Sequence, residues 1–213
     1  MKKIIIYVII GIVIITLIYL IWHKKTGKSL MWLRHRMETT DLIFRHLIIQ
    51  NKEEFLKKVI NVSDTLGLKN PNHLMAVMYK ESGFNPKARN GDTLATGLIQ
   101  FMPATASALN INVNALYNMS NVEQLDYVLK YYQLIKRWTH KNLYTYEDLY
   151  LATFFPAALG KPDDYVLRTS KLSADIIAAQ NPGIDLDKNH IITVGEFKMY
   201  TRKHLGEDIV SRL

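Results

Sequence analysis

Residues 80–106 read KESGFNPKARNGDTLATGLIQFMPATA and carry the part of the chain with recognisable chemistry. Glu81 ends an apolar helical pattern, and Gly83 follows at once as a typical helix stop. We expect the Glu81 carboxyl to lie beside Tyr79, Phe84 and Met102 in a partly apolar cleft, where loss of water favours the protonated form. A protonated glutamate is suited to general-acid catalysis. The same spacing also fits a solvated glutamate at an exposed helix end.

Two motifs in this stretch resemble the signature of soluble-lytic-transglycosylase catalytic domains, which are related in fold to goose-type lysozyme. The motifs are E-S-x-F-N-P-x-A at 81–88 and G-L-I-Q-F-M-P-x-T-A at 97–106. Weaker similarity covers about residues 51–160. The form of the second motif, together with F-P-A-A-x-G-K at 155–161, is most similar to phage virion-associated peptidoglycan-degrading members.

The resemblance implies a role for each matched position. Glu81 stands at the family's catalytic acid, and Ser82 at the position that helps to hold that glutamate. Gln100 and Met102 match residues that line the sugar-binding cleft. Family members usually carry Ala-Tyr-Asn in a later helix, with the tyrosine near the catalytic carboxyl, whereas residues 153–155 here read Thr-Phe-Phe. Phe154 keeps the ring at this substrate-binding position but lacks the hydroxyl.

The reaction that the resemblance implies is cleavage of the β-1,4 bond between N-acetylmuramic acid and N-acetylglucosamine in peptidoglycan. Glu81 gives its proton to the leaving oxygen and then takes one from the muramoyl 6-hydroxyl, which yields a 1,6-anhydro sugar. One carboxyl is sufficient for this chemistry, and no cofactor is required, whereas ordinary glycosidases use two carboxylates. The implied setting is a phage virion-associated lysin for cell entry or lysis.

Other functions stay open on sequence grounds. A hydrolytic lysozyme needs a second carboxylate, for which Asp92 in the N-G-D-T stretch at 90–93 is the nearest candidate, although this is also a plain turn sequence. A cellular, membrane-bound wall-remodelling transglycosylase has the same chemistry. A non-catalytic wall-binding structural protein could retain the fold, but the intact Glu81, Gln100 and Met102 speak against it.

The helix signals predict a mainly α fold, a lysozyme-like transglycosylase domain behind one N-terminal transmembrane helix. Start and stop signals place helices at about 51–66, 71–82, 120–138, 145–160 and 194–205. Ser120, Thr145 and Thr193 each precede an acid by three residues, which is the capping-box pattern. A short hairpin fits within 91–102. The 213 residues are 48% hydrophobic and include no cysteine, which excludes a disordered chain and a disulfide scaffold.

Residues 4–22 form an uncharged run, IIIYVIIGIVIITLIYLIW, that would span about 28 Å as a helix. We therefore expect an anchor at 1–22, a connector at 23–50 and the catalytic domain at 51–213. A cleaved signal peptide and a buried core helix are the alternatives. The lysines after the run favour a cytoplasmic domain, whereas the substrate favours a domain facing the cell wall. The expected location is single-pass and membrane-anchored, facing the wall, in a virion or virion membrane.

The net charge of +8 is concentrated at one end, because residues 1–30 carry five lysines and no acid. The remaining residues carry only +3, so nucleic acid is not an expected partner. The expected partners are peptidoglycan as the substrate, a lipid membrane through residues 4–22, and other virion proteins.

The stretch DLDKNHIITVGE at 185–196 resembles a twelve-residue EF-hand calcium loop. The candidate ligands are Asp185, Asp187, Asn189, the Ile191 carbonyl and Glu196. Hard oxygen donors at these spacings suit a structural calcium ion. His190 replaces the glycine that takes the sharp turn, and a side chain disfavours the positive φ needed there. The alternative is a degenerate loop that serves as a turn and helix cap.

Overall fold

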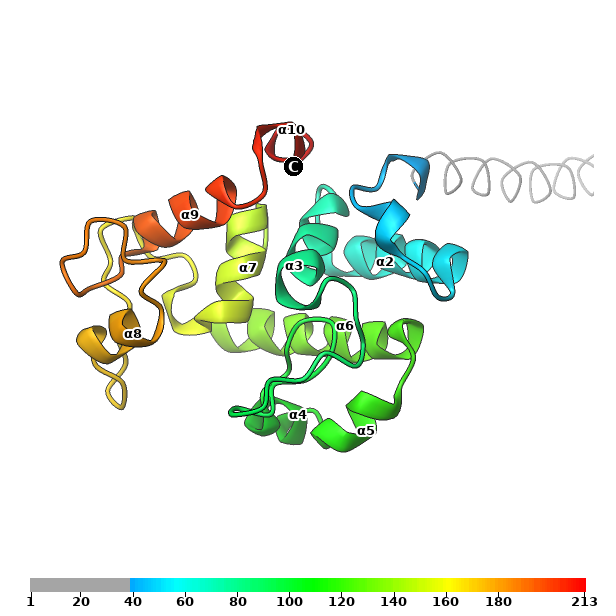
Figure 1. The fold of residues 1–213 in the computed structure, drawn as a ribbon, viewed down its shortest axis with the longest axis horizontal. Helices are drawn as coiled ribbons and strands as arrows, with labels where there is room; N and C mark the ends of the chain where they lie inside the picture. The colour runs from blue at the N-terminus through cyan, green and yellow to red at the C-terminus, as the bar shows by residue number, and fades with distance from the viewer. Residues whose placement is uncertain (1–38) are drawn as a thin grey trace, which may run out of the picture. The chain divides into compact units, whose positions relative to one another are not determined.

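Helices carry the fold of residues 39–213, the part of the chain that the computed structural model describes (Figure 1). Contacts divide the chain into two units, Met1–Asp41 and Leu42–Leu213. The helices of the second unit are η1 (Arg45–Leu47), α2 (Lys52–Leu66), α3 (Asn72–Ser82), α4 (Pro103–Ala108), α5 (Val113–Asn118), α6 (Asn121–Thr139), α7 (Tyr146–Phe154), η2 (Pro156–Ala158), α8 (Ala174–Gln180), α9 (Val194–Lys203) and α10 (Glu207–Val210). The mainly α part of the predicted fold class holds for these residues.

The predicted membrane-spanning helix is the part of the fold class that needs correction. None of the helices within residues 39–213 is long and apolar enough to cross a membrane. Even the 19-residue α6 interleaves its buried positions with charged residues such as Asp126, Lys130 and Arg137. The expected span at 4–22 lies outside the described residues. The fold class is therefore corrected to a mainly helical domain, and the expected single-pass membrane-anchored location is not supported.

Local signals set most of the helix ends. The capping boxes at Ser120, Thr145 and Thr193 are all formed, with reciprocal bonds between the hydroxyl residue and the acid three positions on. Gly83 ends α3 in the left-handed conformation at φ 58°, as a helix-terminating glycine does. Asn51 departs from the prediction: its side chain makes no capping bond to α2 and donates instead to Asn121.

The helix expected at 145–160 is shorter than its apolar pattern suggests. α7 ends at Phe154, and a 3-10 turn follows at Pro156–Ala158. Pro156 cannot donate the next backbone hydrogen bond and its ring crowds the preceding turn, so the α-helix stops before it. This early end separates the α7 residues from the F-P-A-A motif that comes after them.

The core lies where α2, α3, α6 and α7 pack together. α3 stands beside α7, and α6 runs across below both in Figure 1. Leu42, Ile43 and Ile48 are also buried, so the end of the expected connector contributes to the core, while residues 23–38 lie outside the described part. The largest fully buried side chains in the described residues are Tyr132, Tyr146, Phe55, Phe101, Phe197, Ile43, Ile60, Leu66, Leu74, Met75, Met78 and Leu98.

The predicted hairpin at 91–102 is reduced to isolated bridges. Thr96 pairs antiparallel with both Arg89 and Phe101, and its backbone exchanges two hydrogen bonds with Phe101, of 3.0 and 2.9 Å. This pairing folds the second motif back on the end of the first. Within the described residues, these contacts do not extend into a β-strand.

The C-terminal part of the unit packs on α7. After α8, the loop at 185–196 leads into α9, which contacts α7 (Figure 1). The end of that loop is held by a short pairing: Leu167 donates to the Ile192 carbonyl at 2.8 Å, and Val194 donates to the Tyr165 carbonyl at 3.0 Å. The segment before α8 thereby fixes the start of α9.

Candidate active site

Glu81 lies in the last turn of α3, half-buried, with tyrosines from two other helices around it. Tyr131 and Tyr132 come from α6, and Tyr146 and Tyr150 from α7; each of the four is electrostatically coupled to the Glu81 carboxyl. All four rings are at most 9% exposed. The glutamate therefore faces a largely apolar wall that carries phenol hydroxyls.

Burial raises the pKa of Glu81 to about 7, while a hydrogen bond from the Tyr150 hydroxyl and the charge of Lys80 oppose the rise. Burial also raises the pKa of Tyr150, so its hydroxyl keeps its proton and donates to the glutamate. A carboxyl with a pKa near neutral is comparably able to lose and to gain a proton at pH 7, which is the property of an acid that later acts as a base. Glu81 is withdrawn from water, and the groups that interact with its carboxyl are Lys80 and the tyrosines of α6 and α7.

Ser82 joins the two sequence motifs. Its hydroxyl lies 3.0 Å from the Leu98 carbonyl oxygen and 3.2 Å from that of Met78. The expected role of holding the glutamate thus takes an indirect form, because Ser82 fixes the end of α3 to the second motif.

Gln100 and Met102 have different surroundings in the second motif. The Gln100 amide donates to the carbonyl oxygens of Gly97 at 3.1 Å and Ala88 at 3.3 Å, and its backbone has a positive φ of 53°. Met102 is 45% exposed, which leaves its side chain accessible to a ligand. Gln100 shapes the loop through these bonds, and Met102 presents apolar surface.

Gln124 was not predicted from the sequence, although it organises the loops around the site. It is fully buried in α6; its carbonyl oxygen accepts from the Leu98 N–H at 2.9 Å, and its amide donates to the Pro86 and Leu116 carbonyls. A Cβ on Gly97 would lie 2.3 Å from the Gln124 oxygen, and Gly97 also has a φ of 85°. The motif glycine is required by this close approach. The signal that could have identified Gln124 is the presence of a polar residue on the apolar face of α6.

Tyr150, whose hydroxyl bonds to Glu81, was not predicted as a site residue from the sequence. It lies in no recognised motif, and nothing in the sequence pattern distinguishes it from the other tyrosines of α6 and α7. It lies one helical turn before Phe154, and residues four apart share a helix face. The Phe154 ring stacks on Phe197, with centroids 5.1 Å apart, so the hydroxyl beside Glu81 comes from Tyr150 instead.

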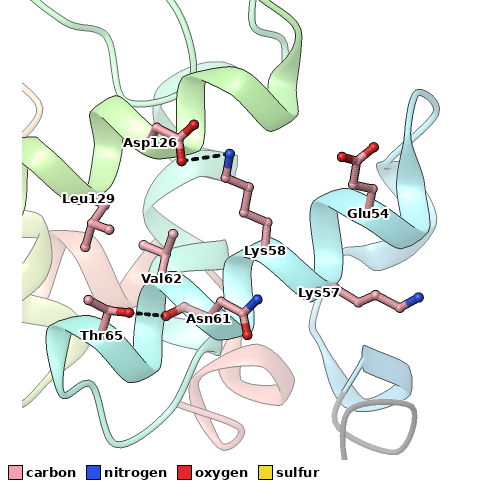
Figure 2. Close-up of a pocket in the computed structure, with 8 residues that line it drawn as sticks. All are labelled: Glu54, Lys57, Lys58, Asn61, Val62, Thr65, Asp126 and Leu129. Atoms are coloured by element: carbon pink, nitrogen blue, oxygen red, sulfur yellow. Dashed lines mark hydrogen bonds and ion pairs between the residues drawn. The ribbon is translucent and has the colours of Figure 1, made fainter. Parts of the chain in front are cut away.

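Two hollows lie apart from this cluster of tyrosines. A cavity of about 620 Å³ has Phe84, Asn85 and Met119 among its lining residues. A groove of about 380 Å³ lies between α2 and α6, where the Lys58 ammonium pairs with Asp126 at 2.8 Å (Figure 2). Glu81 lines neither of them.

The loop at 185–196 brings three of its five predicted ligands together. Carboxylate oxygens of Asp185, Asp187 and Glu196 lie within 4.8 Å of one another. Asn189 donates its backbone N–H to Asp185 and Asp187, and its own side-chain oxygen accepts from the Ile191 N–H. Each carboxylate also accepts backbone bonds but retains oxygen lone pairs, so the donor set fits a hard cation.

His190 occupies the tight turn of this loop. Its φ is 68°, the conformation expected for a glycine at that place, and its N–H donates to Asp185 at 3.0 Å. The chain therefore forms the turn despite the side chain.

Comparison with known protein families agrees with the geometry. Residues 54–128 match the family model described as the transglycosylase SLT domain. No solved structure matches the chain. The matched range contains Glu81 and both motifs but ends before α7, so it excludes Tyr150. The match at residues 54–128 confirms the predicted resemblance to the lytic transglycosylases, the peptidoglycan-cleaving and lysozyme-like family.

Proposed function

We propose that the protein cleaves the β-1,4 bond between N-acetylmuramic acid and N-acetylglucosamine and releases 1,6-anhydro products, with Glu81 as its single acid and base. The observation that carries this proposal is the desolvated Glu81 carboxyl, whose pKa is raised to about 7 within the matched domain. Gln100 and Met102 are the proposed cleft residues, and Ser82 connects the two motifs through its bond to the Leu98 carbonyl. The Phe154 ring stacks on Phe197.

The proposed reaction uses the carboxyl twice. Protonated Glu81 transfers its proton to the glycosidic oxygen as the bond from that oxygen to C1 of the muramoyl residue breaks. The carboxylate then accepts the proton of the muramoyl 6-hydroxyl as the 6-oxygen bonds to C1. Between the two steps the Tyr150 hydroxyl donates to the carboxylate, which stabilises its charge. The acid is regenerated, and no water is consumed.

Hydrolysis is the competing outcome, since it needs a water and ordinarily a second carboxylate. Asp92, the candidate from the sequence, lies exposed in a turn whose N–H groups donate to Asn90. Because Asp92 is exposed to solvent, it does not share the desolvated environment of Glu81. This favours the single-carboxylate reaction.

The test is mass analysis of the fragments released from purified peptidoglycan. Anhydro ends are lighter by one water than reducing ends, so the two reactions give separate masses. Anhydro ends from the wild-type protein, and no fragments from a Glu81→Gln variant, are the expected results. Reducing ends would establish a hydrolytic lysozyme. Binding to the wall without release of fragments would establish a non-catalytic wall protein.

We further propose that the enzyme acts as a phage virion-associated lysin, with other virion proteins as neighbours. The support is the form of the sequence at 97–103 and 155–161, which resembles the phage members of the family. Mass spectrometry of purified particles should detect the protein. Its presence in uninfected cells instead would indicate a cellular wall-remodelling enzyme.

We also propose that the loop at 185–196 binds a structural calcium ion through Asp185, Asp187, Asn189, the Ile191 carbonyl and Glu196. The support is the clustering of three carboxylates within 4.8 Å in a loop that is already folded. The chemistry at Glu81 needs no metal in this mechanism. The ion would instead stabilise the start of α9.

A further inference from the structure

Tyr150 lies between two helices that are far apart in the chain. Its hydroxyl bonds to Glu81 at the end of α3, and its ring contacts Phe197 on α9. The Phe197 ring is 1% exposed; its centroid is 5.5 Å from that of Tyr150, edge to face, and 5.1 Å from that of Phe154, stacked. Phe197 therefore fills the space behind both rings of α7.

The segment that carries Phe197 contacts both α3, which carries Glu81, and α7, which carries Tyr150. Arg202 on α9 forms an ion pair with Glu147 on α7, whose side chain is only 8% exposed. Further on, the backbone oxygens of residues 212–213 accept hydrogen bonds at the start of α3, from Asn70 at 2.8 and 3.1 Å and from Asn72 at 3.3 Å. Residues 194–213 thus connect α7 to α3 from outside the matched domain.

Close packing gives this contact a consequence for the site. A buried phenol ring keeps its orientation only while its neighbours fill the space around it, because a vacated volume lets the side chain turn into it. On the α9 side, the ring that packs edge to face against Tyr150 is that of Phe197. Losing its ring would free Tyr150 to move away from Glu81.

We propose that Phe197 is a positioning residue of the active site, which holds Tyr150 so that the Tyr150 hydroxyl stays on the Glu81 carboxyl. This proposal rests on the proposed role of Glu81 as acid and base. Phe197 touches no reacting atom and acts through Tyr150.

The groups that face Glu81 set the direction of the expected effect. They are Lys80 on its own helix, Tyr131 and Tyr132 from α6, and Tyr146 and Tyr150 from α7. Burial raises the pKa of Glu81 and the Tyr150 bond opposes that rise, so loss of the bond raises the pKa further. Because the first step needs the protonated acid, activity falls as pH rises through this pKa. Loss of Phe197 should therefore move the alkaline limb of the pH profile to higher pH.

The experiment compares Phe197→Ala, Tyr150→Phe and the double variant with the wild-type full chain. It measures kcat and KM on purified peptidoglycan against pH, and the Glu81 pKa by carbon NMR of labelled glutamate. Each single variant should raise the alkaline limb by about one pH unit and lower kcat about tenfold with KM within about twofold. The double variant should show no further shift, and Phe197→Leu should be intermediate. Met199→Ala, on the exposed side of α9, is the matched control and should resemble the wild type.

A folded Phe197→Ala protein in which the Glu81 pKa and the alkaline limb of the pH profile match the wild type would overturn the proposal. So would a double variant in which the two shifts of the alkaline limb add. If Phe197→Ala does not fold, Phe197→Val takes its place and the same outcomes decide. If the wild-type protein cleaves no peptidoglycan, the proposed function fails separately, because the NMR titration still reports whether Phe197 controls the Glu81 carboxyl through Tyr150.

Discussion

Glu81 and Glu196 are both withdrawn from water, but they lie at opposite ends of their helices. Glu81 is in the last turn of α3, where the helix dipole disfavours a negative charge. Glu196 is in the first turn of α9, where the dipole favours one, and it accepts bonds from the Thr193 N–H and hydroxyl at 2.9 Å and from the Leu186 N–H at 3.1 Å. Glu81 faces buried tyrosines, and among them Tyr150 donates a hydrogen bond to its carboxyl.

The difference teaches that burial does not assign a role to a carboxyl. The number of hydrogen-bond donors and the position at the helix start or end decide whether the ionised carboxylate is stabilised. Glu81, poorly compensated, becomes a group that exchanges its proton near neutral pH. Glu196, well compensated, is suited to hold a turn and a cation. Four predictions test this contrast.

The largest expected effect is on catalysis. Glu81→Gln should reduce cleavage of peptidoglycan by about 10⁴-fold or more, because the amide is nearly isosteric but cannot transfer the proton in either step. Release of soluble fragments measures it. Asp92→Asn, in the exposed turn between the motifs, is the matched control and should lose less than about tenfold. Equal inactivation by both variants would indicate a two-carboxylate hydrolase.

The second effect is on stability. The same Glu81→Gln variant that loses activity is expected to be more stable than the wild type. Between pH 4.5 and 7 the folded protein keeps the Glu81 proton that the unfolded chain releases, so folding is penalised as pH rises through this range. Above pH 7, Glu81→Gln should unfold with a free energy higher than that of the wild type by up to about 3 kcal/mol. Below pH 4.5 the two should agree. Urea unfolding at pH 4 and pH 8 measures the difference, and an equal stability at pH 8 would contradict the desolvation of Glu81.

The third effect concerns the well-compensated carboxylates. Calcium should raise the melting temperature of the protein, with about 2.7 kcal/mol of stabilisation at a free ion concentration 100 times the Kd. Asp185→Asn and Glu196→Gln should each abolish the rise, and Glu196→Gln should also lower stability without calcium, because the capping box weakens. Asp164→Asn, an exposed acid outside the loop, is the control. No shift at millimolar calcium would mean that the loop serves only as a turn and cap.

The smallest effect is expected in the groove between α2 and α6 (Figure 2). The Lys58–Asp126 pair is partly solvated, with side chains 25% and 58% exposed, so solvent screens it. Lys58→Met and Asp126→Asn should each change the free energy of unfolding by less than about 1 kcal/mol. Both should leave cleavage within about twofold of the wild type. A larger loss of activity would place this groove in the substrate path.

The sequence alone predicted the features that depend on neighbours in the chain. The capping boxes at Ser120, Thr145 and Thr193 form because each donor and acceptor lie three residues apart, a distance that the helix itself sets. The prediction of Glu81 as the acid rests on two adjacent motifs, both within the range that matches the family model. Where a local signal competed with a distant partner it failed, as at Asn51, whose side chain bonds to Asn121. The membrane-spanning helix, predicted from the apolar run at 4–22, is not supported.

Only the tertiary structure decided which side chains serve the glutamate. Periodicity shows that Tyr150, Phe197 and Gln124 face inward, but it does not say which of the other buried residues each one meets. Those contacts depend on how α3, α6, α7 and α9 cross, and the crossing is settled by the packing of the whole core. Tyr150 reaches Glu81 and Phe197 reaches Tyr150 across segments that are far apart in the chain. For that reason Glu81 could be predicted as the acid from the sequence, whereas the residues that contact it could not be predicted.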